Sequence, residues 1–529
     1  MENKKMKIIS IASIIALALT LVTATYAFFV AQTGEGAQTD IKINANTVDT
    51  FTFEAGSALN LSLNQENFAS GKGNQTGTTF AKAMLTANNK TNTATEHYYL
   101  YLNISNNTFT YSIDNNTPEI LLSIKDGSNN EITSVSGLTY KTVTDGKGAS
   151  IKGFDITTKS GLITILNNRE ITTTSTKTEQ WNVTVTFVNY NANQAGNAGK
   201  RFSAKLMIQQ EKILTVLSDV CTSGNNLATC ITTLSNKSEP SIVNIYHHDS
   251  SLANGARDNS YRYAGANPNN FVCFGTTESP CPTDNLYRII GVINDKVKLI
   301  KYDYMTTDEL GTDGDYSQTY KEWGMDSTYK GTYGDGERIG VYYWNYKATG
   351  SATNTWSTSL LNKTNLNTNF INNIGTTWAN KIATVTWKVG GNTWANIGTK
   401  TSSVAYTNEI TNPVTTNTTD NATTYSAKIG LMYVSDYGFA ASPDAWTLTM
   451  SSYNNTTATN NNWMYMGLYE WTISRDADYS DIAFDVYDDG SVNDNYVDNN
   501  YGVRASFNLE SSVSYVSGSG SMSDPIVIN

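Results

Sequence analysis

Histidine is the scarcest of the residues that carry chemistry in this chain. The 529 residues include only three histidines and four cysteines. A serine or cysteine nucleophile usually needs an imidazole base, so a Ser/His/Asp arrangement is not expected here. Paired acids such as Asp488-Asp489 fit a turn better than acid–base work. We therefore expect a protein without a catalytic centre.

Charge is also sparse, and basic charge is the minority. Charged residues make up 16% of the chain, and 36 Lys and Arg stand against 47 Asp and Glu, a formal net charge of −11. Nucleic acids and anionic membranes select for positive patches, so neither is expected as a partner. Asn, Thr, Ser and Gly fill the gap, as in many secreted β proteins. A chain of 529 residues suggests roughly three domain-sized portions.

Long apolar runs are missing beyond the first thirty residues. Three lysines among the first seven residues precede an apolar run over residues 8–22. Thr25 and Ala27 then occupy the −3 and −1 positions of a cleavage site, which predicts a secretory signal over residues 1–27. The alternative is an uncleaved anchor, because apolar character continues to Val30 and about 23 residues can span a bilayer. Both interpretations place the chain outside the cytoplasm, and only the second makes the membrane a partner.

The four cysteines fall into two close pairs. Four cysteines allow three connectivities. We predict the local pairing, Cys221 with Cys230 and Cys273 with Cys281, because it closes the shortest loops. Neither a C-x-x-C spacing nor a nearby histidine supports a zinc site for all four.

Apolar and polar residues alternate from about Thr39 to Gln210. The clearest runs place apolar residues at 59, 61 and 63, at 100, 102 and 104, at 181, 183, 185 and 187, and at 202, 204, 206 and 208. Alternation of this kind buries one face of a strand and exposes the other. Turn residues separate the runs, as at Asp126-Gly127. The pattern predicts an antiparallel β-sandwich over residues 28–211.

The signal sequence carries a family resemblance. Thr25-Tyr26-Ala27-Phe28-Phe29, followed by a β-rich segment of this length, resembles the camelysin and biofilm-matrix-fibre family over residues 1–211. The resemblance implies a jelly-roll-like sandwich and, in some members, assembly into extracellular fibres by strand donation. Metallopeptidase activity, described for camelysins, is not carried over. The segment has no His-Glu-x-x-His sequence, and His97 is its only histidine.

Residues 212–258 break the period-two pattern. Apolar residues at helical spacing suit short amphipathic helices, and we interpret the segment as a connector stapled by the first disulfide. His247 and His248 could bind a metal. No third ligand is evident, so we favour a solvent-exposed loop pair.

The third portion, residues 259–529, mixes strands and helix. A hairpin is expected over 286–300 around Asn294-Asp295, a helical region over 356–375, and a Thr/Asn-rich insertion over 399–424. Further strands are expected over 429–434, 469–474 and 503–509. A second hairpin over 482–492 is expected to turn in type I′ geometry at Asp488-Asp489-Gly490.

Two short sequences give this portion a second resemblance. Trp471-Thr472-Ile473-Ser474-Arg475, with Gly502-Val503-Arg504 about thirty residues on, resembles the C-type-lectin-like domains of bacterial surface proteins. That group includes formylglycine-generating enzymes and retroelement-diversified binding proteins. The resemblance implies an α+β fold and ligand contacts on the late segment. We assign structural roles to Trp471 and Arg504. Ala505 stands where relatives often have Pro.

The resemblance does not extend to formylglycine generation. That chemistry needs a reactive cysteine late in the fold, whereas Cys273 and Cys281 lie at its start. The Glu-Pro-Asn and Trp-Asn-Asp signatures of calcium-dependent lectins are missing too, so no specific sugar is implied. The acidic segment 308–315 offers oxygen ligands but misses the EF-hand register. No cofactor is predicted, and Ca²⁺ is the alternative left open.

The predicted recognition surface lies between Arg475 and Arg504. Alternation places Ile482, Phe484 and Val486 in the core and sends Ala483, Asp485 and Tyr487 outward. Tyrosine with short polar residues gives a large contact area at low entropic cost. The candidate binding residues are Tyr479, Asp485, Tyr487, Asp494, Tyr496, Asp498 and Tyr501. Arg504 is expected to pair with Asp485 or Glu470, and the alternative for the whole segment is a solvated β-surface.

The sequence thus predicts an exported cell-surface adhesin or ligand-binding protein. It would be mainly β and multidomain, with the C-terminal domain recognising an extracellular protein or glycan. The alternative is a structural subunit of an extracellular fibre or biofilm matrix that self-assembles through the N-terminal sandwich. An enzyme is the third and least favoured interpretation.

Overall fold

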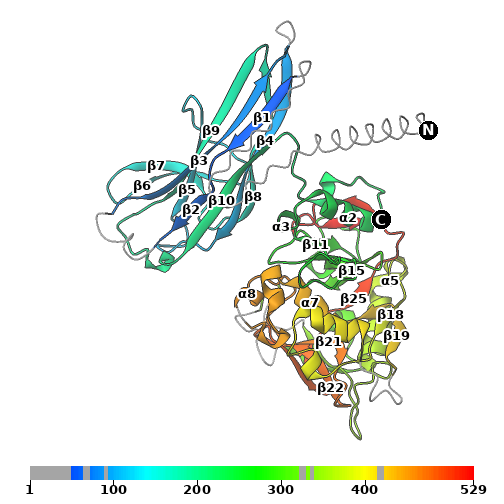
Figure 1. The fold of residues 1–529 in the computed structure, drawn as a ribbon. Helices are drawn as coiled ribbons and strands as arrows, with labels where there is room; N and C mark the ends of the chain where they lie inside the picture. Colours follow the sequence, from blue (N-terminus) through cyan, green and yellow to red (C-terminus); the bar gives the residue numbers. More distant parts are fainter. Residues whose placement is uncertain are drawn as a thin grey trace, which may run out of the picture. The chain divides into compact units, whose positions relative to one another are not determined.

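The computed structural model describes residues 49–63, 72–88, 93–320, 329–333, 339–413, 422–454 and 456–529. The expected signal over residues 1–27, its cleavage site and residues 414–421 of the Thr/Asn-rich insertion expected over 399–424 lie outside the described residues. The chain forms two compact units, unit 1 (Met1–Ile213) and unit 2 (Leu214–Asn529) (Figure 1). It is mainly β, with 38% strand and 18% helix, and its sheets are largely antiparallel.

Unit 1 is built from long strands and short turns. The strands are β1 (Thr50–Ala55), β2 (Leu59–Ser62), β3 (Gln75–Thr86), β4 (Ala94–Asn107), β5 (Ile120–Asp126), β6 (Tyr140–Thr144), β7 (Ser150–Asp155), β8 (Gly161–Thr173), β9 (Thr176–Phe187) and β10 (Arg201–Gln209). One sheet has the order β1-β3-β9-β5-β7-β6 and the other β2-β10-β4-β8. A short 3-10 turn, η2 (Ala195–Asn197), precedes β10.

The two sheets of unit 1 share one hydrophobic core. The period-two prediction is confirmed, because apolar residues at the alternating positions are buried, among them Leu61 on β2, Leu102 on β4 and Val183 on β9. Hydrogen bonds also join the sheets. The Tyr98 hydroxyl on β4 donates to Glu179 on β9 at 2.6 Å and accepts from Nε1 of Trp181 at 2.8 Å.

Unit 2 combines sheets with short helices. Its helices are α2 (Leu227–Lys237), α3 (Pro240–Val243), α4 (Thr307–Leu310), α5 (Ile371–Ala379), α6 (Ser402–Tyr406), α7 (Val434–Ala440) and α8 (Thr456–Thr459). The 3-10 segments are η3 (Leu217–Asp219), η4 (Thr283–Asn285), η7 (Trp394–Asn396), η9 (Pro443–Thr447) and η10 (Met450–Ser452), and the π segments are η6 (Leu361–Phe370) and η8 (Thr407–Thr411). Among the residues that the structure describes, no helix has both the length and the apolar character needed to cross a membrane.

The strands of unit 2 form three sheets in its described part. They are β11 (Ile245–His247), β12 (Tyr261–Tyr263), β13 (Phe271–Cys273), β14 (Leu286–Ile293), β15 (Lys296–Lys301), β16 (Tyr316–Thr319), β17 (Gly340–Tyr343), β18 (Val385–Lys388), β19 (Thr424–Ala427), β20 (Ile429–Gly430), β21 (Glu470–Arg475), β22 (Ile482–Val486), β23 (Val492–Tyr496), β24 (Asn500–Gly502), β25 (Ser506–Asn508), β26 (Tyr515–Ser517) and β27 (Ile526–Ile528). The largest sheet has the order β20-β25-β15-β14-β13-β27-β26, with β12 on β14 and β11 on β12. The second has the order β16-β17-β24-β21-β22-β23, and β18 pairs with β19.

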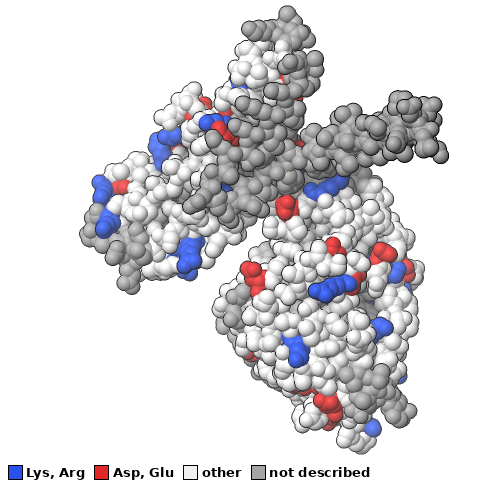
Figure 2. Space-filling model, in the orientation of Figure 1, with Lys and Arg blue, Asp and Glu red and all other residues white. Residues whose placement is uncertain are grey.

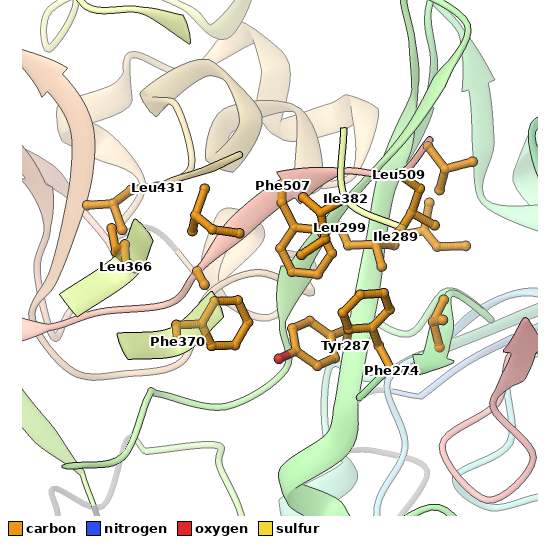
Figure 3. Close-up of a cluster of buried hydrophobic side chains, with 14 of the residues drawn as sticks. Phe274, Tyr287, Ile289, Leu299, Leu366, Phe370, Ile382, Leu431, Phe507 and Leu509 are labelled. Carbon is orange, nitrogen blue, oxygen red and sulfur yellow. The ribbon is translucent and has the colours of Figure 1, made fainter. Parts of the chain in front are cut away.

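Aromatic rings fill the main core of unit 2, shown in Figure 3. The ring centroids of Phe274 and Tyr287 lie 5.4 Å apart, and each lies within 5.5 Å of the Phe507 ring on β25. Phe370, at the end of η6, reaches the same ring at 6.3 Å. The core therefore joins the largest sheet to the η6–α5 helical segment.

The segment expected to be a connector belongs to unit 2 from Leu214 onward. The predicted amphipathic helices are present as α2 and α3, but their apolar side chains, such as Leu227 and Ile231, are buried in the main core. Both local disulfides are confirmed: Cys221 bonds to Cys230, and Cys273 bonds to Cys281. An amphipathic helix needs an apolar partner, and here the large sheet supplies it.

The two predicted hairpins of unit 2 are confirmed, but one of their turns is not. Asn294 and Asp295 both have positive φ, 49° and 59°, as a type I′ turn requires. At the second turn only Gly490 has positive φ, 91°, and its N–H donates to the Tyr487 carbonyl. The expected type I′ turn at Asp488-Asp489 is therefore wrong. A glycine in the left-handed region closes this turn instead.

Three other expected elements are shorter or longer than the sequence pattern indicated. The strand expected over 429–434 stops at Gly430, and helix α7 begins at Val434. The strand expected over 503–509 is reduced to β25. The helix expected to end at Gly375 continues to Ala379, with a kink at Gly375 where φ is 76°. Buried apolar runs occur in strands, helices and coil alike. The lengths of these three elements therefore could not be inferred from apolar character alone.

Candidate recognition site

Strand β22 is buried on both faces, which corrects part of the predicted recognition surface. Phe484 and Val486 are buried, as predicted, in one hydrophobic cluster with Tyr437, whereas Ile482 is only half-buried. Ala483 and Asp485 were expected to point outward, but both are buried. Ala483 belongs to the main core, which covers the second face of the strand with Trp471. The alternation identified two faces correctly but could not show that both are covered.

Asp485 is a buried acid with an unmatched oxygen. Its side chain is 0% exposed, and Oδ1 accepts a hydrogen bond from Nδ2 of Asn495 at 3.1 Å. Oδ2 has no hydrogen-bond partner in the described part of the chain. Burial raises the pKa of Asp485 well above its usual range. The carboxyl group therefore favours its neutral, protonated form.

Tyr487 and Tyr501 are tied into a polar network beside Asp485. Nδ2 of Asn495 also donates to the Tyr487 hydroxyl at 3.2 Å, and Nδ2 of Asn499 donates to the Tyr501 hydroxyl at 3.2 Å. The Tyr469 ring lies between them, with its centroid 4.9 Å from that of Tyr487 and 5.1 Å from that of Tyr501. Tyr501 is buried and Tyr487 is half-buried. Both tyrosines thus act mainly in packing, whereas the sequence predicted them to be binding residues.

Three other tyrosines are well exposed in unit 2. Tyr479 and Tyr496 are each 58% exposed, and Tyr346 is 47% exposed. The segments that carry them are joined by backbone hydrogen bonds. The N–H of Asn345 donates to the carbonyl of Val497 at 3.1 Å, next to Tyr346 and Tyr496 respectively. We call Tyr346, Tyr479 and Tyr496 the tyrosine face.

The loop that carries Tyr479 is fixed by hydrogen bonds to its backbone. Oδ1 of Asp476 accepts from the N–H of Asp478 at 2.6 Å and from the N–H of Tyr479 at 3.1 Å. The N–H of Asn354 donates to the carbonyl of Ser480 at 2.6 Å, and this contact holds the loop against the segment that follows Tyr346. A fixed backbone lets an exposed tyrosine bind with little loss of loop entropy.

The remaining acidic candidates differ in environment. Asp498 is exposed, and Asp494 on β23 is half-buried. Burial raises the pKa of Asp494 to about 6, and the neighbouring Asp476 carboxylate adds to the increase. Asp494 therefore titrates close to neutral pH, unlike an ordinary surface aspartate.

Of these three exposed tyrosines, Tyr479 and Tyr496 are among the residues predicted from the sequence, whereas Tyr346 is not. Tyr346 lies more than a hundred residues earlier in the chain, and strand β17 brings it to the same region. Tyr343 on β17 pairs with Asn500 on β24, and its ring stacks on that of Tyr346 with centroids 4.6 Å apart. No local sequence pattern predicts that Tyr346 reaches this region. Only the sheet order could have shown it.

Trp471 and Arg504 occupy buried structural positions. Nε1 of Trp471 donates to the Tyr342 carbonyl at 2.9 Å. Nε of Arg504 donates to Oε1 of Glu470 at 2.8 Å, and Nη2 donates to the Met464 carbonyl at 2.7 Å. Glu470 was one of the two carboxylates expected to pair with Arg504. The other, Asp485, is hydrogen-bonded to Asn495 instead.

Carboxylates of the acidic segment 308–315 form ion pairs and hydrogen bonds with other groups of the protein. Glu309 pairs with Lys301 at 2.9 Å, and Asp313 accepts from Asn369 at 2.6 Å. Asp315 accepts from the N–H of Tyr346 at 3.0 Å and from the N–H of Leu361 at 2.8 Å. Within the described ranges no group of three or more His, Cys, Asp or Glu side chains is arranged to hold a metal ion.

The two neighbouring histidines are not a matched exposed pair. His247 is partly exposed and stacks on Tyr261 with ring centroids 4.2 Å apart. His248 is buried against Phe439 and Trp446, so the expectation of an exposed loop pair is wrong for it. Burial lowers the pKa of His248 to about 3.

A second feature of unit 2 is an aromatic pocket of about 330 Å³. Nζ of Lys298 lies 4.5 Å from the ring centre of Tyr433 and 5.2 Å from that of Trp387. Asp436 pairs with Lys298 at 2.5 Å and with Arg262 at 3.0 Å, and Arg262 also pairs with Asp258. Lys298 and Arg262, the two buried cations of this pocket, therefore each have a carboxylate partner.

The visible surface of unit 2 is mostly uncharged. Figure 2 shows its lysines, arginines and acids scattered singly, without a large patch of either sign. No protein-family model matches the chain, and no curated protein matches it. The geometry of unit 2 is therefore the basis for a functional proposal.

Proposed function

We propose that this chain is an exported cell-surface adhesin or ligand-binding protein, in which unit 2 recognises an extracellular protein or glycan and no reaction is catalysed. The observation that carries the proposal is the tyrosine face. Three large aromatic side chains are exposed on segments whose backbones are hydrogen-bonded to one another. Tyrosine supplies contact area together with a polar hydroxyl, which is why binding surfaces are rich in it.

The fold proposed for each unit agrees with such a role. Two antiparallel sheets around one core support a jelly-roll-like sandwich for unit 1, which would serve as a stalk or assembly module. The β14–β15 hairpin, the η6–α5 helical segment and the late sheet with β21 and β22 support a C-type-lectin-like fold for unit 2. In that fold the late segments that carry Tyr479 and Tyr496 would contact the ligand.

The two disulfides support the proposed location. Disulfides persist in oxidising compartments outside the cytosol, and both cysteine pairs of this chain are bonded. We propose that the N-terminal signal over residues 1–27 directs the export.

The histidines support a non-catalytic role. His97 lies 3.6 Å from Glu170 in unit 1, His247 stacks on Tyr261, and His248 is buried between aromatic rings. The low pKa of His248, caused first by burial, makes it a poor proton acceptor.

A binding screen tests the proposal. The full chain would be applied to an array of glycans and extracellular matrix proteins, and the best ligand would then be mapped by hydrogen exchange. We expect protection in residues 343–346, 476–480 and 493–500. Protection confined to unit 1, or filament growth without any ligand, would favour the fibre-subunit alternative instead.

A further inference from the structure

Arg288 is a buried cation without a carboxylate partner among the residues that the structure describes. It lies on β14 opposite Phe271 on β13, and it is 5% exposed. Nε donates to Oδ1 of Asn270 at 2.7 Å, Nη1 to the Trp463 carbonyl at 3.2 Å, and Nη2 to the Pro268 carbonyl at 3.2 Å. A guanidinium has five N–H groups, so these bonds leave two for a further acceptor.

The contrast with Arg504 shows what Arg288 lacks. The two guanidinium groups donate to neighbouring carbonyls, those of Trp463 and Met464. Arg504 is neutralised by Glu470, whereas the contacts of Arg288 are to neutral groups. Besides the three oxygens, these are the rings of Phe271 and Trp463, whose centres lie 4.3 and 4.6 Å from the guanidinium carbon. Burial lowers the pKa of Arg288 to about 9, Tyr302 offsets part of this, and the charge of Arg504 adds to it. Arg288 nevertheless stays charged at neutral pH. A buried charge of this kind is costly unless something pairs with it.

Arg288 lines a cavity of about 480 Å³ with a marked chemical bias. A second cation, Lys330, lies at the same cavity, with Nζ 4.3 Å from the Tyr465 ring centre and 2.9 Å from the Thr459 carbonyl. No Asp or Glu is among the described residues that line it, although the chain carries a formal net charge of −11. The cavity therefore favours an anion.

The other residues that line the cavity indicate which class of anion would fit. Trp463, Tyr465 and Phe271 supply aromatic surface, and Asn267, Asn269 and Asn460 supply amide groups. Asn462 also lines the cavity, but its amide is hydrogen-bonded to the Tyr437 carbonyl and the Met464 N–H. Aromatic rings pack on the apolar face of a sugar, and amides bond its hydroxyls. A cavity of this size suits a small ligand. A guanidinium matches the planar geometry of a carboxylate.

We propose that this cavity, the Arg288 pocket, binds an acidic sugar through its carboxylate, with Arg288 as the partner of the carboxylate and Lys330 as a second positive group. The inference rests on the proposed role of unit 2 in recognition, but it uses residues outside the tyrosine face. A ligand in the pocket would supply the negative charge that the protein does not provide for Arg288.

Calorimetric titration of the full chain with glucuronate and with glucose tests the proposal. We expect glucuronate to bind and glucose, which lacks the carboxylate, to bind at least tenfold more weakly. Arg288→Met should abolish the preference, and Arg288→Lys should weaken it because the fork of donors is lost. Equal binding of both sugars, or heat from inorganic sulfate alone, would overturn the acidic-sugar assignment.

A second variant tests the pocket without replacing a buried residue, so that a loss of binding cannot be due to misfolding. Asn460 lines the pocket but is itself exposed, so Asn460→Asp should fold normally and weaken glucuronate by charge repulsion, most strongly at low salt. Val404→Ala, an exposed position on α6 outside the pocket, is the matched control and should bind as the parent chain does. Unchanged glucuronate affinity in Asn460→Asp would contradict the proposal. Loss of glucuronate binding with intact binding of an array-identified ligand would separate this site from the tyrosine face.

Discussion

Arg504 and Glu470 form a fully enclosed ion pair: Nε of Arg504 lies 2.8 Å from Oε1 of Glu470, and neither side chain is more than 3% exposed. Burial raises the pKa of Glu470, and Arg504 opposes that effect. The pair joins the start of β21 to the coil between β24 and β25. It therefore helps to hold together the late sheet, whose strand β23 ends at Tyr496.

Breaking this pair should destabilise unit 2 more than removing both partners. Arg504→Met leaves Glu470 buried and unpaired, and a loss of about 3–5 kcal/mol in the free energy of unfolding is expected. The double variant Arg504→Met, Glu470→Met should lose less, because no buried charge remains. Urea unfolding of the three chains measures the difference. A double variant less stable than the single one would show that the pair is not the dominant contact.

His248 should make unit 2 sensitive to acid. Burial lowers the pKa of His248 from 6.5 to about 3. Between these two values the unfolded chain binds a proton at this side chain and the folded chain does not. Stability therefore falls as the pH drops below 6.5, by roughly 2–3 kcal/mol by about pH 4.5. His248→Asn, which keeps an acceptor for the Ala256 N–H, should flatten this part of the stability curve. His247→Asn is the control, and an equal flattening there would refute the assignment.

Asp485 should have the opposite pH dependence. Its raised pKa means that the folded chain keeps a proton that the unfolded chain has released, so stability falls as the pH rises above the ordinary value of 3.8. Asp485→Asn removes the titrating group and should raise stability at neutral pH relative to the parent chain. Thermal unfolding at pH 4 and pH 7 measures the effect. If the variant is less stable than the parent at pH 7, the carboxyl is ionised and the interpretation is wrong.

Replacing Phe484 should destabilise the fold, whereas replacing an exposed tyrosine should leave the free energy of unfolding nearly unchanged. Phe484 is buried, and its ring stacks 6.3 Å from that of Trp394, so Phe484→Ala should cost about 3–5 kcal/mol of stability. Tyr479→Ala and Tyr496→Ala should leave the free energy of unfolding within about 0.5 kcal/mol of the parent value. Chemical unfolding of each variant provides the comparison. A large loss in either tyrosine variant would mean that the exposed rings support the fold.

Local pattern was enough for much of this architecture. Alternation placed Leu61, Leu102 and Val183 in the core of unit 1, and short cysteine spacing gave both disulfides. The same alternation misplaced Asp485, because sequence cannot tell whether the outer face of a strand meets water or another core. Arg288 sits in an apolar hairpin strand, and nothing near it in sequence shows that no carboxylate of the described residues reaches it. These features depend on which distant segments meet, and local periodicity carries no such information.

The ligand affinity of a chain without the tyrosine face tests the proposed role of unit 2 most directly. Tyr346, Tyr479 and Tyr496 would all be replaced by Ala, and the affinity for the ligand found by the array screen would be compared with that of the parent chain and of Val404→Ala. We expect a loss of about 2–4 kcal/mol in binding free energy, typical of aromatic anchors, with unchanged thermal unfolding. Undiminished affinity in the triple variant would contradict the claim that unit 2 recognises its ligand through this face.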